Sequence, residues 1–354
     1  MTSAESGSWR PVGDRELRIG LAGLGAMGRN HLRVLRSLAG VRVVALADPV
    51  ATSLEEGVSQ TGAAGFDEPL AMVAEAELDA VVIAAPTTAH RGLALAALER
   101  GIAVLVEKPL AATVADALEV VLAARASGVP VLVGHVERFN PAVRELGRLL
   151  GAGWLSTVYA ITSRRAGPFP ERIRDVGVTI DLATHDVDIL CSIAGERPTR
   201  VYAETAQRIH AEREDLLFGL LHFPSGTVAQ LNVDWLTPAK RRQLVVVGEE
   251  GMFELDYLTQ RLTFTRATDT TKPRLIGGYA PTFEGESIEL EVGHGEPLAL
   301  ELESFIRLVR AGGRPEVDAE DGLWAVAMAQ ALLESAADRR AVDLVDLSAR
   351  LTLT

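Results

Sequence analysis

Cysteine is almost absent from this sequence. Cys191 is the single cysteine among 354 residues, so the chain can form neither an intramolecular disulfide nor a cysteine-based metal cluster. This usage is typical of a reducing compartment, and we expect a cytoplasmic protein. Long apolar runs are missing too, since none reaches the roughly 20 residues that a membrane helix needs. We therefore expect no membrane span.

An excess of positive charge is also lacking. The 48 aspartates and glutamates outnumber the 35 lysines and arginines, which gives a formal net charge of -13. A field of this sign opposes phosphate, so we expect no nonspecific binding to nucleic acid or to anionic membranes. The length predicts two domains. Residues 1–14, rich in Ser and Gly and without an apolar core, predict a mobile tail rather than a signal peptide.

A glycine-rich stretch between Leu17 and Asp48 is the strongest signal in the chain. Gly23, Gly25 and Gly28 follow a short apolar run in the spacing G-x-G-x-x-G, and apolar residues at helical intervals come next. The pattern predicts a strand, a tight turn and a helix whose first N–H groups bind a pyrophosphate. The predicted cofactor site includes the two residues between the last glycines, Ala26 and Met27.

Asp48 ends the next predicted strand, 20 residues after Gly28. A carboxylate at this position binds the ribose diol of an adenine dinucleotide and repels the 2′-phosphate of NADP. The residues that follow it, Pro49, Val50 and Ala51, include no arginine. We therefore expect NAD rather than NADP. An ordinary strand-helix-strand unit with a chance acid is the alternative.

Short apolar strands and helices continue to alternate up to about residue 135. Strands predicted at 78–85, 102–106 and 131–134 are separated by helices, which is the pattern of a doubly wound parallel sheet, a Rossmann domain over 15–135. Ligands bind beyond the carboxyl ends of such strands. The residues that follow the strands should therefore rim one crevice, and they include Pro86, Thr87, Glu107 and Lys108.

Strand-like segments follow one another in the second part of the chain, with hairpin turns at 223–226 and 248–251. They predict a second α/β domain over 136–354 with a largely antiparallel open sheet. We expect the helices predicted at 298–311 and 322–338 to pack back on the first domain or on this sheet. An exposed apolar sheet face often forms a subunit contact, so we expect a homo-oligomer, a dimer or tetramer.

A second cluster of polar residues lies on a predicted amphipathic helix. Asp181, His185 and Asp188 are spaced i, i+4 and i+7 and should share one face. A carboxylate one turn away can orient an imidazole and raise its basicity, as a general base requires. Oxidation of an alcohol needs a group that removes the hydroxyl proton, and His185 suits that role. Lys108 could hydrogen-bond the same hydroxyl oxygen and stabilise the negative charge that develops on it. The alternatives are a paired surface histidine, a solvated lysine, or a metal site on the helix; nicotinamide chemistry needs no metal, and we expect none.

Several other polar residues lie near these two clusters. Arg138 and Asn140 could contact a substrate or support the helix that Pro141 begins. His90 is expected to be structural, in the first turn of a helix. A cluster of arginines in a Gly/Pro-containing stretch predicts either a solvated loop or an anionic substrate, such as the diphosphate of a nucleotide sugar, and it comprises Arg164, Arg165, Arg172 and Arg174.

Taken in order, four motifs resemble those of the glucose-fructose oxidoreductase/inositol dehydrogenase/rhizopine catabolism family, called Gfo/Idh/MocA. They are Gly23-Leu-Gly-Ala-Met-Gly28, Glu107-Lys108-Pro109, the D-x-x-x-H pair Asp181 and His185, and Asp321-Gly-Leu. The resemblance covers nearly the whole chain. It implies a Rossmann domain and an α/β domain that commonly oligomerises through its open sheet. It also implies NAD(P)-dependent oxidation of a sugar or cyclitol hydroxyl, with Lys108 and His185 in the roles given above.

Three further stretches are similar to one branch of that family, the UDP-N-acetylglucosamine 3-dehydrogenases: Gly134 to Pro141, Gly167-Pro-Phe-Pro, and Ile173 to Gly177. This similarity implies a nucleotide-linked hexose as substrate. An inositol dehydrogenase, another sugar dehydrogenase or a ketoreductase of the same family is the first alternative. A non-catalytic NAD-binding module is an alternative of another class.

Overall fold

The computed structural model describes residues 9–170, 176–267, 274–276, 280–282 and 285–344. The chain forms two compact units, which we describe separately. Unit 1 comprises residues up to 136 together with 296–327, and unit 2 comprises 137–295 together with 328–353. The division predicted from the sequence, 15–135 and 136–354, assigns residues 296–327 to the second domain, whereas in the structure they belong to unit 1.

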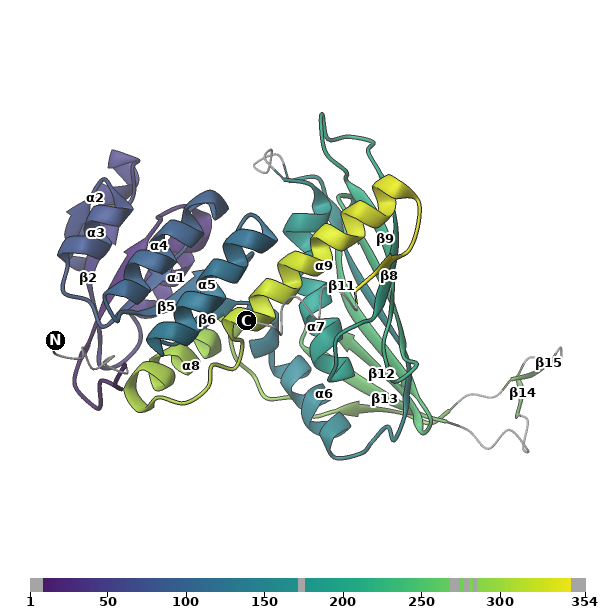
Figure 1. The fold of residues 1–354 in the computed structure, drawn as a ribbon. Coiled ribbons are helices and arrows are strands. Elements are labelled where there is room, and N and C mark those ends of the chain that lie inside the picture. The colour runs from purple at the N-terminus through teal and green to yellow at the C-terminus, as the bar shows by residue number, and fades with distance from the viewer. Residues whose placement is uncertain (1–8, 171–175, 268–273, 277–279, 283–284, 345–354) are drawn as a thin grey trace, which may run out of the picture. The chain divides into compact units, whose positions relative to one another are not determined.

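Unit 1 is built on a six-stranded sheet in the order β3-β2-β1-β4-β5-β6, with parallel pairing throughout (Figure 1). The prediction of a doubly wound parallel sheet is confirmed. The strands are β1 (Leu17–Ala22), β2 (Val41–Ala47), β3 (Ala64–Phe66), β4 (Ala80–Ile83), β5 (Ala103–Glu107) and β6 (Val131–Gly134).

Helices connect these strands, and α8 joins unit 1 from the C-terminal part of the chain. The central strands β4 and β5 are buried along their whole length, which explains their continuous apolar sequence. Gly62 and Gly128 end two helices in the left-handed conformation that glycine favours. The helices are α1 (Ala26–Leu35), α2 (Ala51–Thr61), α3 (Pro69–Glu75), α4 (Thr87–Glu99), α5 (Val114–Ser127) and α8 (Pro297–Ala311).

The structure describes only residues 9–14 of the predicted N-terminal tail. The N–H groups of Val12 and Gly13 donate to the carbonyl oxygens of Val309 and Arg310 at 3.0 and 3.1 Å. These bonds join the segment that leads into β1 to the last turn of α8.

Unit 2 contains a nine-stranded sheet in the order β16-β13-β12-β11-β7-β10-β9-β8-β17. Its pairings are antiparallel except for the parallel pair of β7 and β10, which confirms the predicted largely antiparallel sheet. The strands are β7 (Val158–Pro168), β8 (Arg200–Ala206), β9 (Leu216–His222), β10 (Val228–Asp234), β11 (Leu236–Gly248), β12 (Gly251–Asp256), β13 (Arg261–Arg266), β16 (Ser287–Leu290) and β17 (Val342–Asp343). A separate hairpin pairs β14 (Arg274–Ile276) with β15 (Ala280–Thr282).

Helices lie along one face of this sheet (Figure 1). They are α6 (Pro141–Gly151), α7 (Thr184–Ala194) and the second half of α9 (Ala319–Asp338), which begins in unit 1 and ends in unit 2. A short 3-10 turn, Val136–Phe139, precedes α6. The side chains on the helix-covered face are buried, as in Leu217, Leu221 and Leu231.

The other face of the sheet, which we call the open face, exposes apolar side chains. Along β9 and β10 buried and exposed residues alternate, as the period of two in a strand requires. Phe218, Leu220 and Val228 point to the open face and are 44%, 49% and 41% exposed. Among the described residues no helix covers these positions (Figure 1).

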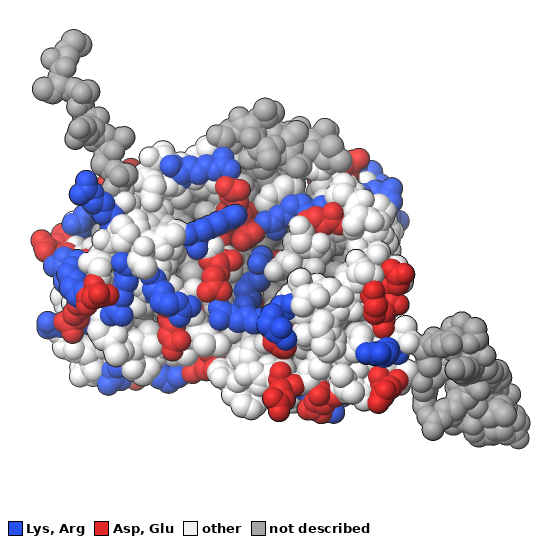
Figure 2. All heavy atoms as spheres, turned by 90° about the horizontal axis from the view of Figure 1, so that it is seen from below, with Lys and Arg blue, Asp and Glu red and all other residues white. Residues whose placement is uncertain are grey.

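Two global expectations can be compared with the described part of the chain. It includes no helix that is both long enough and apolar enough to cross a membrane. On the face of the molecule drawn in Figure 2, the side chains of lysine and arginine are interspersed with those of aspartate and glutamate.

Candidate active site

The glycine turn joins β1 to α1 at the carboxyl end of the unit 1 sheet. Gly23 has φ +93°, and a Cβ placed on it would lie 2.5 Å from the carbonyl oxygen of Ala84. A Cβ on Gly28 would overlap the carbonyl oxygen of Gly23. Both glycines are therefore required by the packing of the protein itself, because any side chain would collide with backbone.

Gly25 differs from the other two glycines. Its backbone, φ -64° and ψ -165°, is one that any residue can adopt, and a Cβ on it would meet no described atom within 4 Å. Neither strain nor packing among the described residues requires glycine here. Space left at this point of the turn fits the close approach of a pyrophosphate to the backbone.

The N-terminus of α1 completes this cradle. Gly25 is the N-cap, and no described side chain caps the helix or places an acid in its first turn. The first N–H groups of a helix lack partners within the helix and carry a partial positive charge, so they suit an anion. Gly25 and Ala26 are exposed and Met27 is half-buried. The residues present therefore fit a dinucleotide.

Asp48 lies beside the same turn. Its carboxylate accepts hydrogen bonds from the N–H of Leu24 at 2.6 Å and from the N–H of Val50 at 2.8 Å, and the residue is 7% exposed. The structure thus brings the acid that ends β2 against the turn that ends β1. Its location is the one that the sequence predicts for a ribose-binding carboxylate.

The ends of β4 and β5 supply the rest of the predicted rim. Pro86 and Thr87 begin α4 directly after β4, and Lys108 follows the last residue of β5. Lys108 is half-buried, whereas its neighbours Glu107 and Pro109 are buried. In the strand order of this sheet, the connections change sides between β1 and β4, which is where open α/β sheets bind their ligands.

Glu107 points into unit 1 and meets a histidine and a second acid. His31 Nε2 lies 2.7 Å from Glu107 Oε1, and one ligand atom from each of His31, Glu107 and Glu301 lies within 4.8 Å of the others. Their exposed fractions are 0%, 9% and 0%. This buried trio has the donor set of a cation site. A proton bound to Glu301 would also reduce the negative charge of the trio.

The pKa shifts within the trio run in opposite directions. Burial alone raises the pKa of Glu107, but the hydrogen bond and charge of His31 outweigh it, and the pKa falls below its ordinary value. Burial and the negative charge of Glu107 raise the pKa of Glu301 well above its ordinary value. Neither oxygen of Glu301 has a hydrogen-bond partner among the described residues. Both shifts favour a protonated Glu301 beside an ionised Glu107.

Sequence reasoning missed His31 and Glu301, although a signal for both exists. Glu301 lies between Leu298 and Phe305 at helical spacing, on the apolar stripe of α8, and His31 lies on the buried face of α1. A polar residue on such a stripe is buried and needs compensation. This pattern indicates a buried polar cluster but does not identify the partners.

The helix that carries Asp181 and His185 in unit 2 is irregular at its start. Residues Thr179–Ala183 form a turn of π-helix, which leads into α7. Between residues 181 and 191 only Asp181 and His185 are half-buried, and the others are buried. Asp181 and His185 are therefore the side chains in this stretch that are partly exposed to solvent.

Asp188 is buried, unlike that pair, and has a partner on another element. Its carboxylate binds the guanidinium of Arg138 at 2.7 and 2.8 Å, and it is 2% exposed. Asn140 caps α6, since its side chain accepts the N–H of Ala142 at 3.1 Å while its amide donates to the carbonyl of Tyr257 at 3.1 Å. Of the two roles considered for Asn140, its described contacts correspond to support of this helix.

Asp186 fastens α7 to the sheet. It accepts hydrogen bonds from Ser163 at 2.5 Å and from Arg165 at 2.6 Å, and Arg165 also donates to Glu137 at 2.9 Å. Burial alone lowers the pKa of Arg165, but the charges of Asp186 and Glu137 raise it above its ordinary value. Arg165 is therefore a buried cation that anchors the residue next to His185.

The first two arginines of the predicted cluster, Arg164 and Arg165, do not lie in a loop, because β7 continues to Pro168. Hydrogen bonding to β10 on one side and β11 on the other keeps residues 164–166 extended. Arg164 and Arg165 consequently point to opposite faces: Arg165 is buried beneath α7, and Arg164 is exposed on the open face. Arg172 and Arg174 lie outside the described residues.

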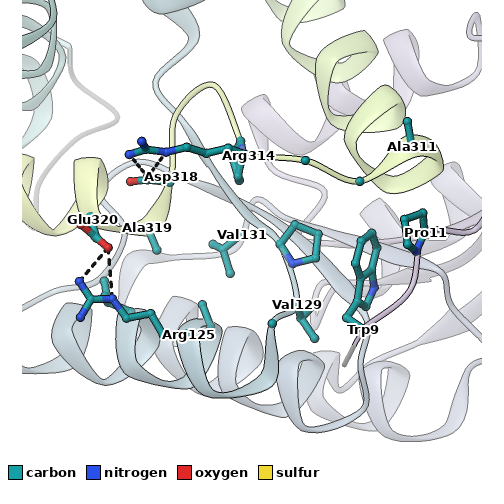
Figure 3. Close-up of a pocket in the computed structure, with 17 residues that line it drawn as sticks. Trp9, Pro11, Arg125, Val129, Val131, Ala311, Arg314, Asp318, Ala319 and Glu320 are labelled. Carbon is teal, nitrogen blue, oxygen red and sulfur yellow. Dashed lines mark hydrogen bonds and ion pairs between the residues drawn. The ribbon is translucent and has the colours of Figure 1, made fainter. Parts of the chain in front are cut away.

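A hollow of about 620 Å³ in unit 1 lies apart from these groups (Figure 3). Trp9, Pro11 and Val129 line it, and its two arginines are paired, Arg125 with Glu320 and Arg314 with Asp318. It opens beside Val131, the first residue of β6, at the end of the strand opposite to the rim described above. None of the described site residues lines this hollow.

A parallel sheet with a glycine turn at the start of α1, and a second unit with a largely antiparallel sheet, give the architecture typical of a two-domain nucleotide-dependent enzyme. Residues 17–135 match the model of the oxidoreductase family with an NAD-binding Rossmann fold, and residues 143–254 match the model of the GFO/IDH/MocA C-terminal domain. The chain belongs to the Gfo/Idh/MocA family of oxidoreductases. The predicted enzyme class, an NAD(P)-dependent oxidoreductase acting on CH-OH groups, is confirmed.

Curated relatives and solved structures resemble the chain over most of its length. D-apiose dehydrogenase from Paraburkholderia graminis is 30% identical over 93% of this chain and 90% of its own length. UDP-N-acetylglucosamine 3-dehydrogenase from Acidithiobacillus ferrooxidans is 25% identical over 83% of this chain and 89% of its own. The structure of the latter has a TM-score of 0.80 at 23% identity, covering 90% of this chain and 97% of that one. The WlbA dehydrogenase from Bordetella pertussis, in complex with NADH and UDP-GlcNAcA, has a TM-score of 0.77 at 24% identity, with 93% and 99% covered.

A pair of glycine substitutions separates binding from packing. We expect Gly25→Ala to leave thermal stability unchanged and to weaken NAD binding by roughly tenfold or more, about 1.4 kcal/mol, because its methyl group occupies only ligand space. Gly28→Ala should lower the free energy of unfolding by about 1–3 kcal/mol, because its methyl group collides with Gly23. Fluorescence titration with NADH and thermal melting measure the two effects. A destabilised Gly25→Ala protein with normal NADH affinity would contradict this assignment.

The neutral Glu301 carboxyl predicts a pH dependence of stability. Its pKa is higher folded than unfolded, so the folded chain binds more protons, and stability falls as pH rises from the ordinary glutamate value through the folded value. Glu301→Gln removes this loss, so the variant should gain on the wild type by up to about 1.4 kcal/mol per pH unit over that range. Urea unfolding between pH 5 and pH 8 measures it. Glu303→Gln, at an exposed glutamate of the same helix, is the control. An equal gain in stability with pH for Glu303→Gln would show that the pH dependence does not come from the buried Glu301.

Proposed function

We propose that this protein is an NAD-dependent dehydrogenase that oxidises a ring hydroxyl of a hexose, with a nucleotide-linked hexose as the favoured substrate. The observation that carries the proposal is the rim of unit 1, where Gly25 leaves space at the N-terminus of α1 and Lys108 follows β5 on the same edge of the sheet. Membership of an oxidoreductase family supports the reaction class.

The residues that would hold the cofactor all belong to unit 1. The glycine turn and the first N–H groups of α1 would bind the pyrophosphate, and Asp48 would accept hydrogen bonds from the ribose diol. Pro86 and Thr87 would line the site beyond β4. A carboxylate at position 48 favours NAD over NADP, because it repels a 2′-phosphate.

The chemistry would be carried by three side chains of this chain. NAD, when bound, accepts the hydride that leaves the carbinol carbon. His185 would take the hydroxyl proton as a general base, and Asp181 would orient the imidazole. Lys108 would hydrogen-bond the same oxygen and stabilise the negative charge that develops on it before the carbonyl forms. Lys108 belongs to unit 1 and His185 to unit 2, and their joint action on one oxygen is part of the proposal.

The choice of substrate rests on the relatives. The Acidithiobacillus ferrooxidans relative acts on UDP-N-acetylglucosamine by its name, and the Paraburkholderia graminis relative acts on D-apiose. The second supports the alternative of a dehydrogenase or ketoreductase for another sugar or for inositol. The arginines add little support for a bound diphosphate, because Arg138 and Arg165 bind buried acids and Arg164 points to the open face. The presence of both Lys108 and His185 argues against a non-catalytic NAD-binding module.

A substrate panel tests the proposal directly. We expect NAD to be reduced with UDP-N-acetylglucosamine or a related nucleotide sugar, as seen by NADH absorbance, and we expect little reduction with D-apiose or myo-inositol. Reduction with a free sugar alone would favour the alternative. NADH binding without turnover of any member, in either direction, would favour the binding module.

Two substitutions test the chemical roles. Lys108→Met should leave NADH affinity nearly intact and reduce kcat/KM by roughly 10²–10⁴-fold, and His185→Asn should produce a loss in the same range. Lys240, the other lysine among the described residues, is exposed on β11, so Lys240→Met is a matched control that keeps full activity. Retention of activity by Lys108→Met would exclude the role given to it.

We further propose that copies of the chain associate through the open face of the unit 2 sheet. Phe218, Leu220 and Val228 are exposed apolar side chains on the adjacent strands β9 and β10. The half-buried Val245 and Val247 of β11 lie on the same face, with β7 between the two groups. Exposed apolar areas often mark subunit contacts.

Light scattering or sedimentation tests this association. Leu220→Asp places a charge on the open face and should convert the oligomer to monomers while leaving the monomer folded, because the side chain is 49% exposed. Leu70→Asp, a substitution in unit 1 at a leucine that is 52% exposed, is the control and should not change the molecular mass. Equal masses for wild type and Leu220→Asp would refute the proposed interface.

A further inference from the structure

His90 is a buried histidine that contacts two of the loops proposed to carry function in unit 1, those after β4 and β5. It lies on the first turn of α4 and is 1% exposed. Its Nε2 is 2.9 Å from the carbonyl oxygen of Ala85, and its Nδ1 is 2.8 Å from the carbonyl oxygen of Pro109. Ala85 directly precedes Pro86, and Pro109 directly follows Lys108. One imidazole therefore lies between the loop after β4 and the loop after β5.

The chemistry of these contacts makes the imidazole more than a space-filling group. Carbonyl oxygens only accept hydrogen bonds, so the ring donates to both loops when both nitrogens carry a proton, and to one loop at a time when the imidazole is neutral. The pKa of His90 lies below its ordinary value, because burial outweighs the hydrogen bonds to the two carbonyls and the charge of Glu107. Each loop faces a different nitrogen, so the two contacts can be removed one at a time.

The two loops have different duties in the proposed function. Pro86 and Thr87 would line the cofactor site, and Lys108 would act on the substrate oxygen. Beyond these contacts, Lys108 donates its backbone N–H to its neighbour Glu107 at 3.2 Å, and Glu107 in turn is held by His31. Besides the pairing of β4 with β5, the contacts of His90 are thus a direct link between the two loops.

We propose that His90 is a positioning residue that fixes the cofactor loop through Nε2 and the Lys108 loop through Nδ1, so that hydride acceptor and lysine are aligned with each other. This inference rests on the proposed function and assigns to His90 a role beyond the first-turn packing that the sequence predicts. It requires no contact between His90 and substrate.

Two amide substitutions separate the contacts. The amide nitrogen of asparagine occupies a position near Nδ1 of histidine, and that of glutamine a position near Nε2. His90→Asn should therefore keep the bond to Pro109 and lose the bond to Ala85, whereas His90→Gln should do the reverse. Both variants keep an N–H donor in a buried site, so neither leaves both carbonyls unpaired.

The expected kinetics are opposite for the two variants. His90→Gln should lower kcat by roughly 10- to 100-fold with NAD affinity little changed, because misplacement of a catalytic group by about 1 Å has an effect of this size. His90→Asn should weaken NAD binding by roughly tenfold and affect kcat less. Glu99→Gln, at the exposed last residue of the same helix, is the control and should change neither quantity.

Amide hydrogen exchange reads the same contacts without substrate or cofactor. We expect faster exchange around residues 85–88 in His90→Asn and around 108–112 in His90→Gln, each compared with the wild type. Equal changes in both variants, or a loss of thermal stability without the kinetic split, would show that His90 is only a packing residue and would overturn the inference. A wild type that neither binds NADH nor turns over any sugar would instead overturn the proposed function, while the exchange pattern still decides the role of His90.

Discussion

The turn after β1 depends on contact between backbone and backbone. Gly23 lies so close to Ala84, and Gly28 so close to Gly23, that no side chain fits at either glycine. This packing brings the ends of β1 and β4 together and sets the start of α1. Asp48 then reaches the turn from β2 through its bond to Leu24. Tight packing of this kind leaves Gly25 as the one glycine of the turn with open space around it, which suits the proposed approach of a pyrophosphate.

Polar groups inside each unit hold the functional segments in place. In unit 1, His31 pairs with Glu107, the residue that precedes Lys108, in a buried site that also holds Glu301. In unit 2, Arg165 and Ser163 bind Asp186, the residue that follows His185. Each network is buried, where an unpaired charge is strongly unfavourable, so loss of one partner destabilises the segment that it holds. The side chains proposed to act, Lys108 and His185, are half-buried beside these networks.

The acids of this helix have different partners. Asp186 and Asp188 are committed to Arg165 and Arg138, while Asp181 shares with His185 the half-buried side of the helix. Spacing in the sequence places residues around a helix but does not show which of them meets a buried arginine.

The amino-acid sequence by itself determined the alternation of strands and helices, the doubly wound sheet, the glycine turn with Asp48 and the placement of Lys108 after a strand. These features are local in the chain, because strand ends, turns and helix starts follow from the period and residue type of short segments. Only the tertiary structure decided the partners of buried charges: Glu301 beside Glu107, Arg165 beneath α7, and His90 between two loops. Such pairs join residues far apart in the chain, and which ones meet depends on how the strands are ordered and how the helices pack on them.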